Sequence, residues 1–390
     1  MIPPRRVMIV GIDCAAPKLV FDRFKDHLPN LTRMRKRGMW GPLRSTIPPI
    51  TVPAWMSMAS GYDPGALGLY GFRKHEAGSY DLKLHDSSDM HLPCLWERLS
   101  AQGKKAASLF VPLSYPPKPF NGWSVTGCLT PDTECNYTWP QDFKQEFETH
   151  FGPYLIDAAE HRQDDRATLF ESLCNMSKQR FAAARYLWSK RQLDFLMMVD
   201  IGMDRMHHAF WKHADPNHPE HDPSDPNINI VRDYYAYLDS EIGQLLSLCD
   251  ENTSVFVVSD HGARSLLGGV NINEWLIEHG FLKLKHRPSS VSALHPEMVD
   301  WKSTSAWAEG GYYARLFINL QGREAQGCVP AENYEALRNS LMDKLSSIDI
   351  AGKQAIAAKA LRAQDCYAKV ARAAAGLDGV FRRSQLPSHW

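Results

Sequence analysis

The sequence predicts an α/β protein built on a doubly wound, mostly parallel sheet with cap or loop insertions. Strand-length apolar runs alternate with amphipathic helical patterns along most of the chain. Such alternation is typical of parallel strands joined by crossover helices that cover both faces of the sheet. At 390 residues, the chain is long enough to bury a substantial core.

The expected strands lie near residues 6–12, 106–112, 193–200, 254–259 and 312–319. The expected helices lie near residues 29–38, 93–102, 165–190, 228–248 and 332–346. In the third of these helices, Leu169, Leu173, Phe181 and Leu187 recur at mixed three- and four-residue steps. That spacing places them on one apolar face.

We interpret residues 1–350 as a single α/β domain with insertions at about 61–92, 113–163 and 283–311. The first two insertions are rich in Gly, Pro and aromatic residues, which favours loops or a cap, and the third is interpreted as an active-site flap. Residues 351–390 form an atypical tail rich in Ala and Arg, for which truncation is one explanation.

Composition excludes several classes of partner. Lys+Arg and Asp+Glu both number 44, so no net charge favours nucleic acid or an acidic membrane. The chain shows neither a signal-peptide core nor an apolar run of the roughly 20 residues that span a bilayer. The eight cysteines are scattered without a C-x-x-C pair, so we expect reduced thiols and a cytoplasmic protein. The oligomeric state is left open.

Acid, hydroxyl and imidazole groups follow the strand-like runs or sit in a loop that precedes a helix. In an open α/β sheet, residues just past the carboxyl ends of strands line one crevice. These groups suit a two-metal site with a covalent nucleophile. The candidates are Asp13, Thr51, Asp204, His208, Asp260 and His261.

Asp260 and His261 give the strongest single signal, because both directly follow an uninterrupted apolar run. Burying a carboxylate beside an imidazole requires a compensating partner, and a divalent cation is the simplest one. Asp13 is weaker evidence by itself, since an Asp in this place can also cap the following turn.

Asp204 and His208 are four residues apart, so on a helix they share one face and can bind one ion. His207 is a competing choice of ligand. An Asp that complements the helix dipole, with histidines on the surface or in the core, is the structural alternative.

Thr51 lies between Pro49 and Pro53, and Pro53 is expected where a helix starts. A hydroxyl just ahead of that start lies near backbone N–H groups that favour a phosphate. The alternative is an ordinary Thr N-cap. A free threonine hydroxyl is a poor nucleophile, and a metal ion can activate it.

In this order along the chain, the residues resemble the alkaline phosphatase superfamily, in its type I phosphodiesterase/nucleotide pyrophosphatase branch. The chain also resembles bacterial proteins described as predicted phosphohydrolases or phosphomutases of that superfamily. The resemblance runs from about residue 6 to residue 347 and rests on Asp13, Pro48–Trp55, Gly61–Pro64, Asp204–His208, Ser259–Gly262, Asp300–Trp301 and Asn319–Glu324.

The resemblance implies a sheet of alkaline-phosphatase type and two divalent metal ions, with Zn²⁺ as the first choice and Mn²⁺ as the alternative. Asp13, Thr51, Asp260 and His261 would surround one ion, and Asp204 and His208 would hold the other. Thr51 would attack phosphorus and form a phosphothreonine intermediate. The implied substrate is a small phosphorylated molecule, with a diester or nucleotide preferred.

One departure from the family weakens the second metal site. The family supplies a third ligand there, a histidine near the C-terminus, whereas the setting of His389 in this chain does not match, and His295 is another possibility. A phosphomonoesterase or phosphomutase, and a non-catalytic binding protein, therefore remain as alternatives. Four aromatic residues are expected either to line an apolar cleft, which would favour a diester, or to pack in the core. They are Trp55, Tyr70, Phe72 and Trp123.

Overall fold

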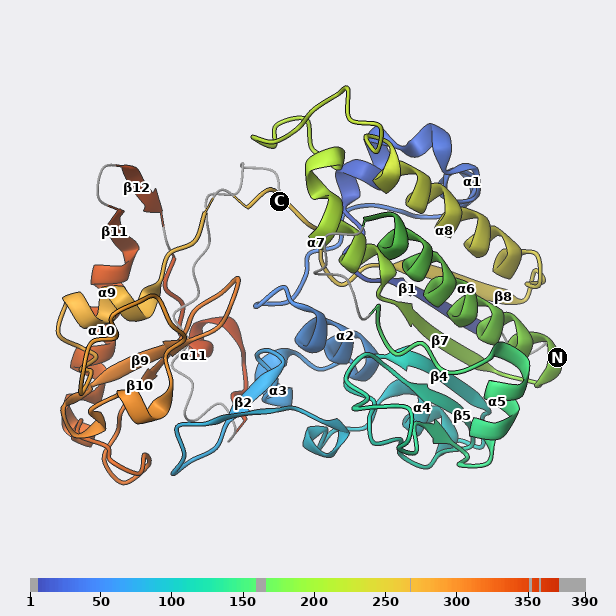
Figure 1. Ribbon diagram of the computed structural model, residues 1–390. Coiled ribbons are helices and arrows are strands. Elements are labelled where there is room, and N and C mark those ends of the chain that lie inside the picture. Colours follow the sequence, from blue (N-terminus) through green and yellow to red (C-terminus); the bar gives the residue numbers. More distant parts are fainter. Residues whose placement is uncertain (1–5, 159–165, 267, 351–352, 358, 372–390) are drawn as a thin grey trace. The chain divides into compact units, whose positions relative to one another are not determined.

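The structure is a computed structural model that describes residues 6–158, 166–266, 268–350, 353–357 and 359–371 (Figure 1). It divides into two compact units. The first unit contains Met1–Gly61 and Asp86–Leu267, and the second contains Tyr62–His85 and Gly268–Trp390. The predicted domain over residues 1–350 and the predicted tail over 351–390 stay predictions.

The first unit is built on a six-stranded sheet in the order β6-β5-β4-β7-β1-β8. Neighbouring strands are parallel except for the antiparallel pair of β5 and β6. The predicted α/β class with a mostly parallel sheet is confirmed. The strands are β1 (Arg6–Ile12), β4 (Ala106–Val111), β5 (Gly122–Thr126), β6 (Thr138–Trp139), β7 (Phe195–Asp200) and β8 (Thr253–Val258).

Helices cover this sheet, and the largest of them pack together on one face (Figure 1). Met8, Val10 and Ile12 of β1 point into the same buried cluster as Leu173 and Tyr234 from two of these helices. The helices of the first unit are α1 (Pro29–Arg37), α2 (Thr51–Ser60), α4 (Leu95–Ser100), α5 (Phe143–Phe151), α6 (Arg166–Lys190), α7 (Gly202–Ala214) and α8 (Ile230–Leu246). No helix in the described part of the chain is both long and apolar enough to cross a membrane.

The opposite face of β1 carries Gly11, because side chains alternate between the two faces of a strand. The indole of Trp55 on α2 occupies the space that a side chain would take there. A Cβ atom added to Gly11 would lie 2.5 Å from Cη2 of Trp55 and 3.0 Å from Cγ2 of Val199. The glycine therefore sets how closely α2 approaches the sheet.

The second unit has its own core, in which Tyr80 stacks on Trp301 and Trp307 stacks on Phe317. It contains three two-stranded sheets, each antiparallel, among its described residues. The elements are α3 (Pro64–Leu67), β2 (Arg73–His75), β3 (Leu82–Leu84), α9 (Ile272–Glu278), β9 (Ala306–Glu309), β10 (Arg315–Ile318), α10 (Tyr334–Ser346), β11 (Ser347–Ile350), β12 (Lys353–Ala357) and α11 (Ala363–Cys366).

Two sequence predictions about the sheet are wrong. The strand expected near 312–319 is β10, which pairs with β9 in the second unit instead of joining the parallel sheet. The segment 113–163, expected to be a loop or cap, supplies β5 and β6 at the edge of the main sheet, together with α5. Its strands are short and its turns are rich in proline, so the strands have too few residues to show a clear apolar pattern in the sequence.

We predict that Gly11→Ala destabilises the first unit by about 1–3 kcal/mol, because the added methyl group forces Trp55 and α2 away from β1. Urea denaturation followed by tryptophan fluorescence measures this change. Gly41→Ala is the matched control, since a Cβ atom there meets nothing within 4 Å, and its effect should stay within about 0.5 kcal/mol. Equal stability of the two variants would contradict the packing argument.

Candidate active site

The segments that follow β7, β1 and β8, which are adjacent in the sheet, supply five of the six candidate residues, and α2 supplies Thr51. Asp13 follows β1 directly, and its backbone N–H donates to the carbonyl oxygen of Asp200 at the end of β7. Asp260 and His261 follow β8, and α7 follows β7. Because parallel strands end at the same edge, the first unit gathers all six predicted residues in one compact body.

Asp13, Asp260 and His261 form the centre of the candidate site. Nε2 of His261 lies 3.5 Å from Oδ1 of Asp13 and 3.2 Å from Oδ2 of Asp260. These two carboxylate oxygens are buried and have no hydrogen-bond partner among the described residues. Ligand atoms of the three side chains all lie within 4.8 Å of one another.

The other oxygen of each carboxylate is held in place by a donor. Trp55 donates its indole N–H to Oδ2 of Asp13 at 2.7 Å. The backbone N–H of Cys14 donates to Oδ1 of Asp260 at 3.0 Å. Asp13 is therefore oriented by α2 instead of capping the turn that follows it, which was the structural alternative.

The pKa shifts of the two carboxyl groups indicate that a positive charge would stabilise their ionised forms. Burial raises the pKa of Asp260 to about 7. Burial, with the neighbouring charge of Asp260, raises the pKa of Asp13 well above its ordinary value. Buried carboxylates behave in this way when nothing compensates them. Two unpaired carboxylate oxygens that face an imidazole nitrogen are a donor set that fits a divalent cation.

Thr51 is the first residue of α2, two residues earlier than the predicted start at Pro53. Ile50 is the N-cap residue and Thr51 is not, so the capping interpretation is wrong. The Thr51 hydroxyl oxygen instead lies 3.3 Å from Nε2 of His261. The first-turn N–H groups of a helix lack intrahelical partners, so this hydroxyl lies where a phosphate is favoured.

Asp204 and His208 lie one turn apart on α7, and Nε2 of His208 is 3.4 Å from Oδ2 of Asp204. Arg205 also contacts this oxygen, at 2.8 Å from Nη1. Its Nη2 is 2.6 Å from Oδ2 of Asp157, so the guanidinium joins the two carboxylates. Burial alone would raise the pKa of Asp157, but the Arg205 guanidinium lowers it.

His207, the competing ligand, is a core residue. Its Nε2 is 3.4 Å from the hydroxyl oxygen of Tyr235, and its ring packs edge-on against Trp211. Burial lowers the pKa of His207 to about 3. It therefore stays neutral in the core, while His208 is the more exposed of the two.

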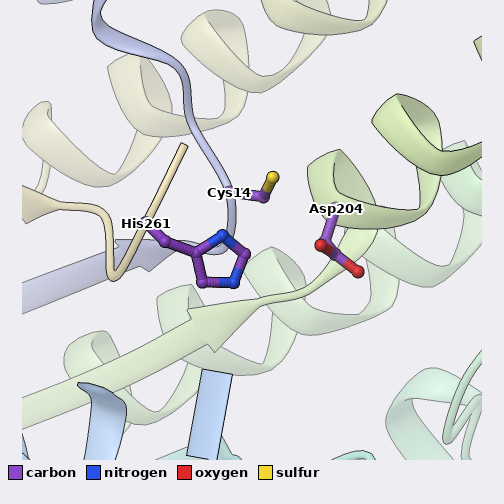
Figure 2. A group of neighbouring side chains, drawn as sticks. All are labelled: Cys14, Asp204 and His261. Atoms are coloured by element: carbon purple, nitrogen blue, oxygen red, sulfur yellow. The ribbon is translucent and has the colours of Figure 1, made fainter. Parts of the chain in front are cut away.

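Cys14 belongs to the site but was not among the predicted residues. Ligand atoms of Cys14, Asp204 and His261 lie within 4.8 Å of one another (Figure 2). Its place directly after Asp13 is a weak signal in the sequence, because that place does not show which way the sulfur points. Arg205 and the Trp55 N–H were also missed as partners of the site carboxylates.

Other expected participants are placed elsewhere. Trp55 and Tyr70 are buried core residues of the first and the second unit respectively, so for these two the core-packing alternative is right. His389 lies outside the described residues. His295 lies in the second unit, just before a short helical turn at Pro296–Met298, and its role as a ligand stays a prediction.

Comparison with known proteins identifies the family. The type I phosphodiesterase / nucleotide pyrophosphatase family matches residues 7–375. The chain belongs to this family. Its members are metal-dependent, and membership supports phosphoester hydrolysis as the reaction. No curated protein sequence matches the chain.

Two solved structures share its fold. Phosphonoacetate hydrolase from Sinorhizobium meliloti 1021, in complex with phosphonoacetate, superposes with a TM-score of 0.60 at 15% identity, over 98% of this chain and 82% of that one. Murine ectonucleotide pyrophosphatase/phosphodiesterase 5 superposes with a TM-score of 0.53 at 10% identity, over 98% and 79%. At these identities, the similarity shows the alkaline-phosphatase type of fold.

We predict that metal-free protein loses stability as pH rises from about 4 to 7. The raised pKa of Asp260, about 7 in the folded state, means that the folded state binds its proton more tightly than the unfolded state does. That contribution is complete below the ordinary Asp pKa of about 3.9 and is lost as pH rises through the folded value.

Thermal unfolding of chelator-treated protein between pH 4 and pH 8 measures this loss, with Asp260→Asn as the comparison. The neutral amide does not titrate, so the wild-type midpoint should fall relative to the variant as pH rises. Added Zn²⁺ should raise the wild-type midpoint more than that of the variant, which lacks one of the proposed carboxylate ligands. Parallel curves for the two proteins would mean that Asp260 does not carry the effect.

Proposed function

We propose that the chain is a metal-dependent phosphodiesterase of the nucleotide pyrophosphatase type, with Thr51 as its nucleophile. The position of the Thr51 hydroxyl carries the proposal. It lies at a helix N-terminus, 3.3 Å from the imidazole nitrogen that faces two unpaired buried carboxylate oxygens. A hydroxyl in such surroundings is suited to nucleophilic attack on an anionic ester.

Asp13, Asp260 and His261, together with Thr51, would hold one divalent ion, and Asp204 with His208 would hold a second. Zn²⁺ is proposed first, because imidazole and carboxylate ligands suit it, with Mn²⁺ as the alternative. When bound, the ions favour the alkoxide form of Thr51 and neutralise charge on the phosphoryl oxygens. We place the protein in the cytoplasm, because all eight cysteines are free thiols.

The protein's own groups then orient the reaction. The N–H groups at the start of α2 favour the phosphoryl oxygens beside Thr51. The oxygen of Thr51 forms a bond to phosphorus while the bond to the leaving oxygen breaks, and the leaving alcohol takes up a proton. Water then attacks the phosphothreonine, the Oγ1–P bond breaks, and a phosphomonoester and the free hydroxyl are released.

A second candidate is a non-catalytic binding protein, and one contact favours it. The Arg205 guanidinium already contacts Oδ2 of Asp204, which is one of the two proposed ligands of the second ion. A phosphomonoesterase or phosphomutase would use the same groups on a different small phosphorylated substrate. Turnover assays separate these candidates.

We predict that Thr51→Ala lowers kcat for bis-p-nitrophenyl phosphate by about 1,000-fold or more, as expected when a nucleophile is removed. Thr51→Ser should keep part of the activity, because its hydroxyl can take the same place. Thr32→Ala is the control, since the Thr32 hydroxyl is exposed on α1 and bonds to the carbonyl of Lys25. Parental turnover by Thr51→Ala would exclude Thr51 as the nucleophile.

The same assay run on three substrates tests the reaction class. Faster hydrolysis of bis-p-nitrophenyl phosphate than of p-nitrophenyl phosphate supports a diesterase, and the reverse order supports a monoesterase or phosphomutase. Phosphonoacetate, the compound bound in the Sinorhizobium meliloti structure, tests for a phosphonate substrate. If the protein binds metal but hydrolyses none of these compounds, and Thr51→Ala behaves in the same way, the result supports a non-catalytic binding protein.

A further inference from the structure

The thiol of Cys14 lies beside Asp204, one of the two residues that would hold the second ion. Its sulfur is within 4.8 Å of ligand atoms of both Asp204 and His261. Figure 2 shows the three side chains converging from the segments that follow β1, β7 and β8, with the sulfur on the side of Asp204. Cys14 is 4% exposed, so the sulfur is directed into the protein.

The backbone holds Cys14 in an unusual conformation. Its φ angle is +63°, in the left-handed region that favours glycine. The N–H of Cys14 donates to Oδ1 of Asp260, and the next N–H, of Ala15, donates to the hydroxyl oxygen of Ser259. These bonds to the segment after β8 fix the turn, and with it the direction of the sulfur.

Within the described part of the first unit, the proposed second ion lacks a third ligand if His261 serves the first. The unpaired oxygens of Asp13 and Asp260 both face Nε2 of His261, which assigns that nitrogen to their ion. Asp204 and His208 then hold the other ion, and a typical protein site for Zn²⁺ offers at least three ligands. Cys14 is the remaining donor in the cluster around Asp204.

We propose that the thiolate of Cys14 is the third protein ligand of the ion held by Asp204 and His208. This inference rests on the proposed function, because it takes up the second of the two proposed ions. The S–H proton is released to solvent as the sulfur–metal bond forms. A thiolate is a soft ligand, so it would make the site select Zn²⁺ over Mn²⁺.

Cobalt substitution tests the sulfur bond directly, without reference to turnover. Co²⁺ bound by a thiolate gives an intense sulfur-to-metal charge-transfer band in the near ultraviolet, whereas Co²⁺ bound only by oxygen and nitrogen gives only the weaker visible bands. We expect the charge-transfer band when the chelator-treated wild-type protein is titrated with Co²⁺. Cys14→Gly should lose that band and keep the visible bands of the first ion.

Cys14→Gly is well suited to this test because glycine adopts a φ of +63° without strain, so the turn is preserved. Circular dichroism and the thermal midpoint should match those of the wild type. Cys249→Ala is the matched control, since Cys249 lies after α8 and its sulfur contacts the carbonyl of Leu245. It should keep the charge-transfer band unchanged.

Zn²⁺ and Mn²⁺ titrations add a second readout. We expect Cys14→Gly to lower the affinity for the second Zn²⁺ by about 100-fold or more. Even the loss of a residue that only hydrogen-bonds to a metal ligand lowers metal affinity by about 10–100-fold. Its affinity for Mn²⁺ should change by less than about threefold, since Mn²⁺ gains little from sulfur.

The outcomes separate this inference from the proposed function. Two cobalt ions bound with no charge-transfer band, or a band that survives in Cys14→Gly, would overturn the role of Cys14 and leave the diesterase proposal standing. Failure of the wild type to bind any divalent ion would overturn both. Loss of the band in Cys14→Gly, with Thr51-dependent diester turnover in the wild type, supports both.

Discussion

The constraint on which the site depends is the burial of Asp13 and Asp260 next to each other. Each carboxylate has one oxygen bonded to a donor, from Trp55 and from the backbone of Cys14, and one oxygen without a hydrogen-bond partner in the described part of the chain. A protein rarely buries two such groups unless a positive charge joins them. The imidazole of His261 beside them supplies a nitrogen donor, so the three groups make a ready site for a cation.

The sheet brings these groups together, and one glycine brings the hydroxyl to them. β1 lies between β7 and β8, so the segments that follow all three strands start from the same edge. Gly11 has no side chain, and the indole of Trp55 fills that space. The same indole bonds to Asp13. Contact with Gly11 and the bond to Asp13 thus position α2, whose first residue is Thr51.

Much of this site could be predicted from sequence, because a strand-length apolar run followed by Asp or His indicates both the strand and its polar end. Asp13, Asp260 and His261 were found in that way. The contribution of Cys14 could not be, because it depends on a positive φ angle and on proximity to Asp204, 190 residues further along the chain. Strands β5 and β6 were missed because segments of two to five residues show no clear hydrophobic period.

Charge balance links Cys14 to the choice of substrate. Arg205 and Asp157 pair with each other and together add no net charge. With two divalent ions bound as proposed, the carboxylates of Asp13, Asp260 and Asp204 and the alkoxide of Thr51 leave the site neutral, and a thiolate at Cys14 gives it one net negative charge. A negative site repels a doubly charged phosphomonoester more strongly than a diester, which carries a single charge. A cysteine ligand would therefore lower the electrostatic advantage of monoesters over diesters.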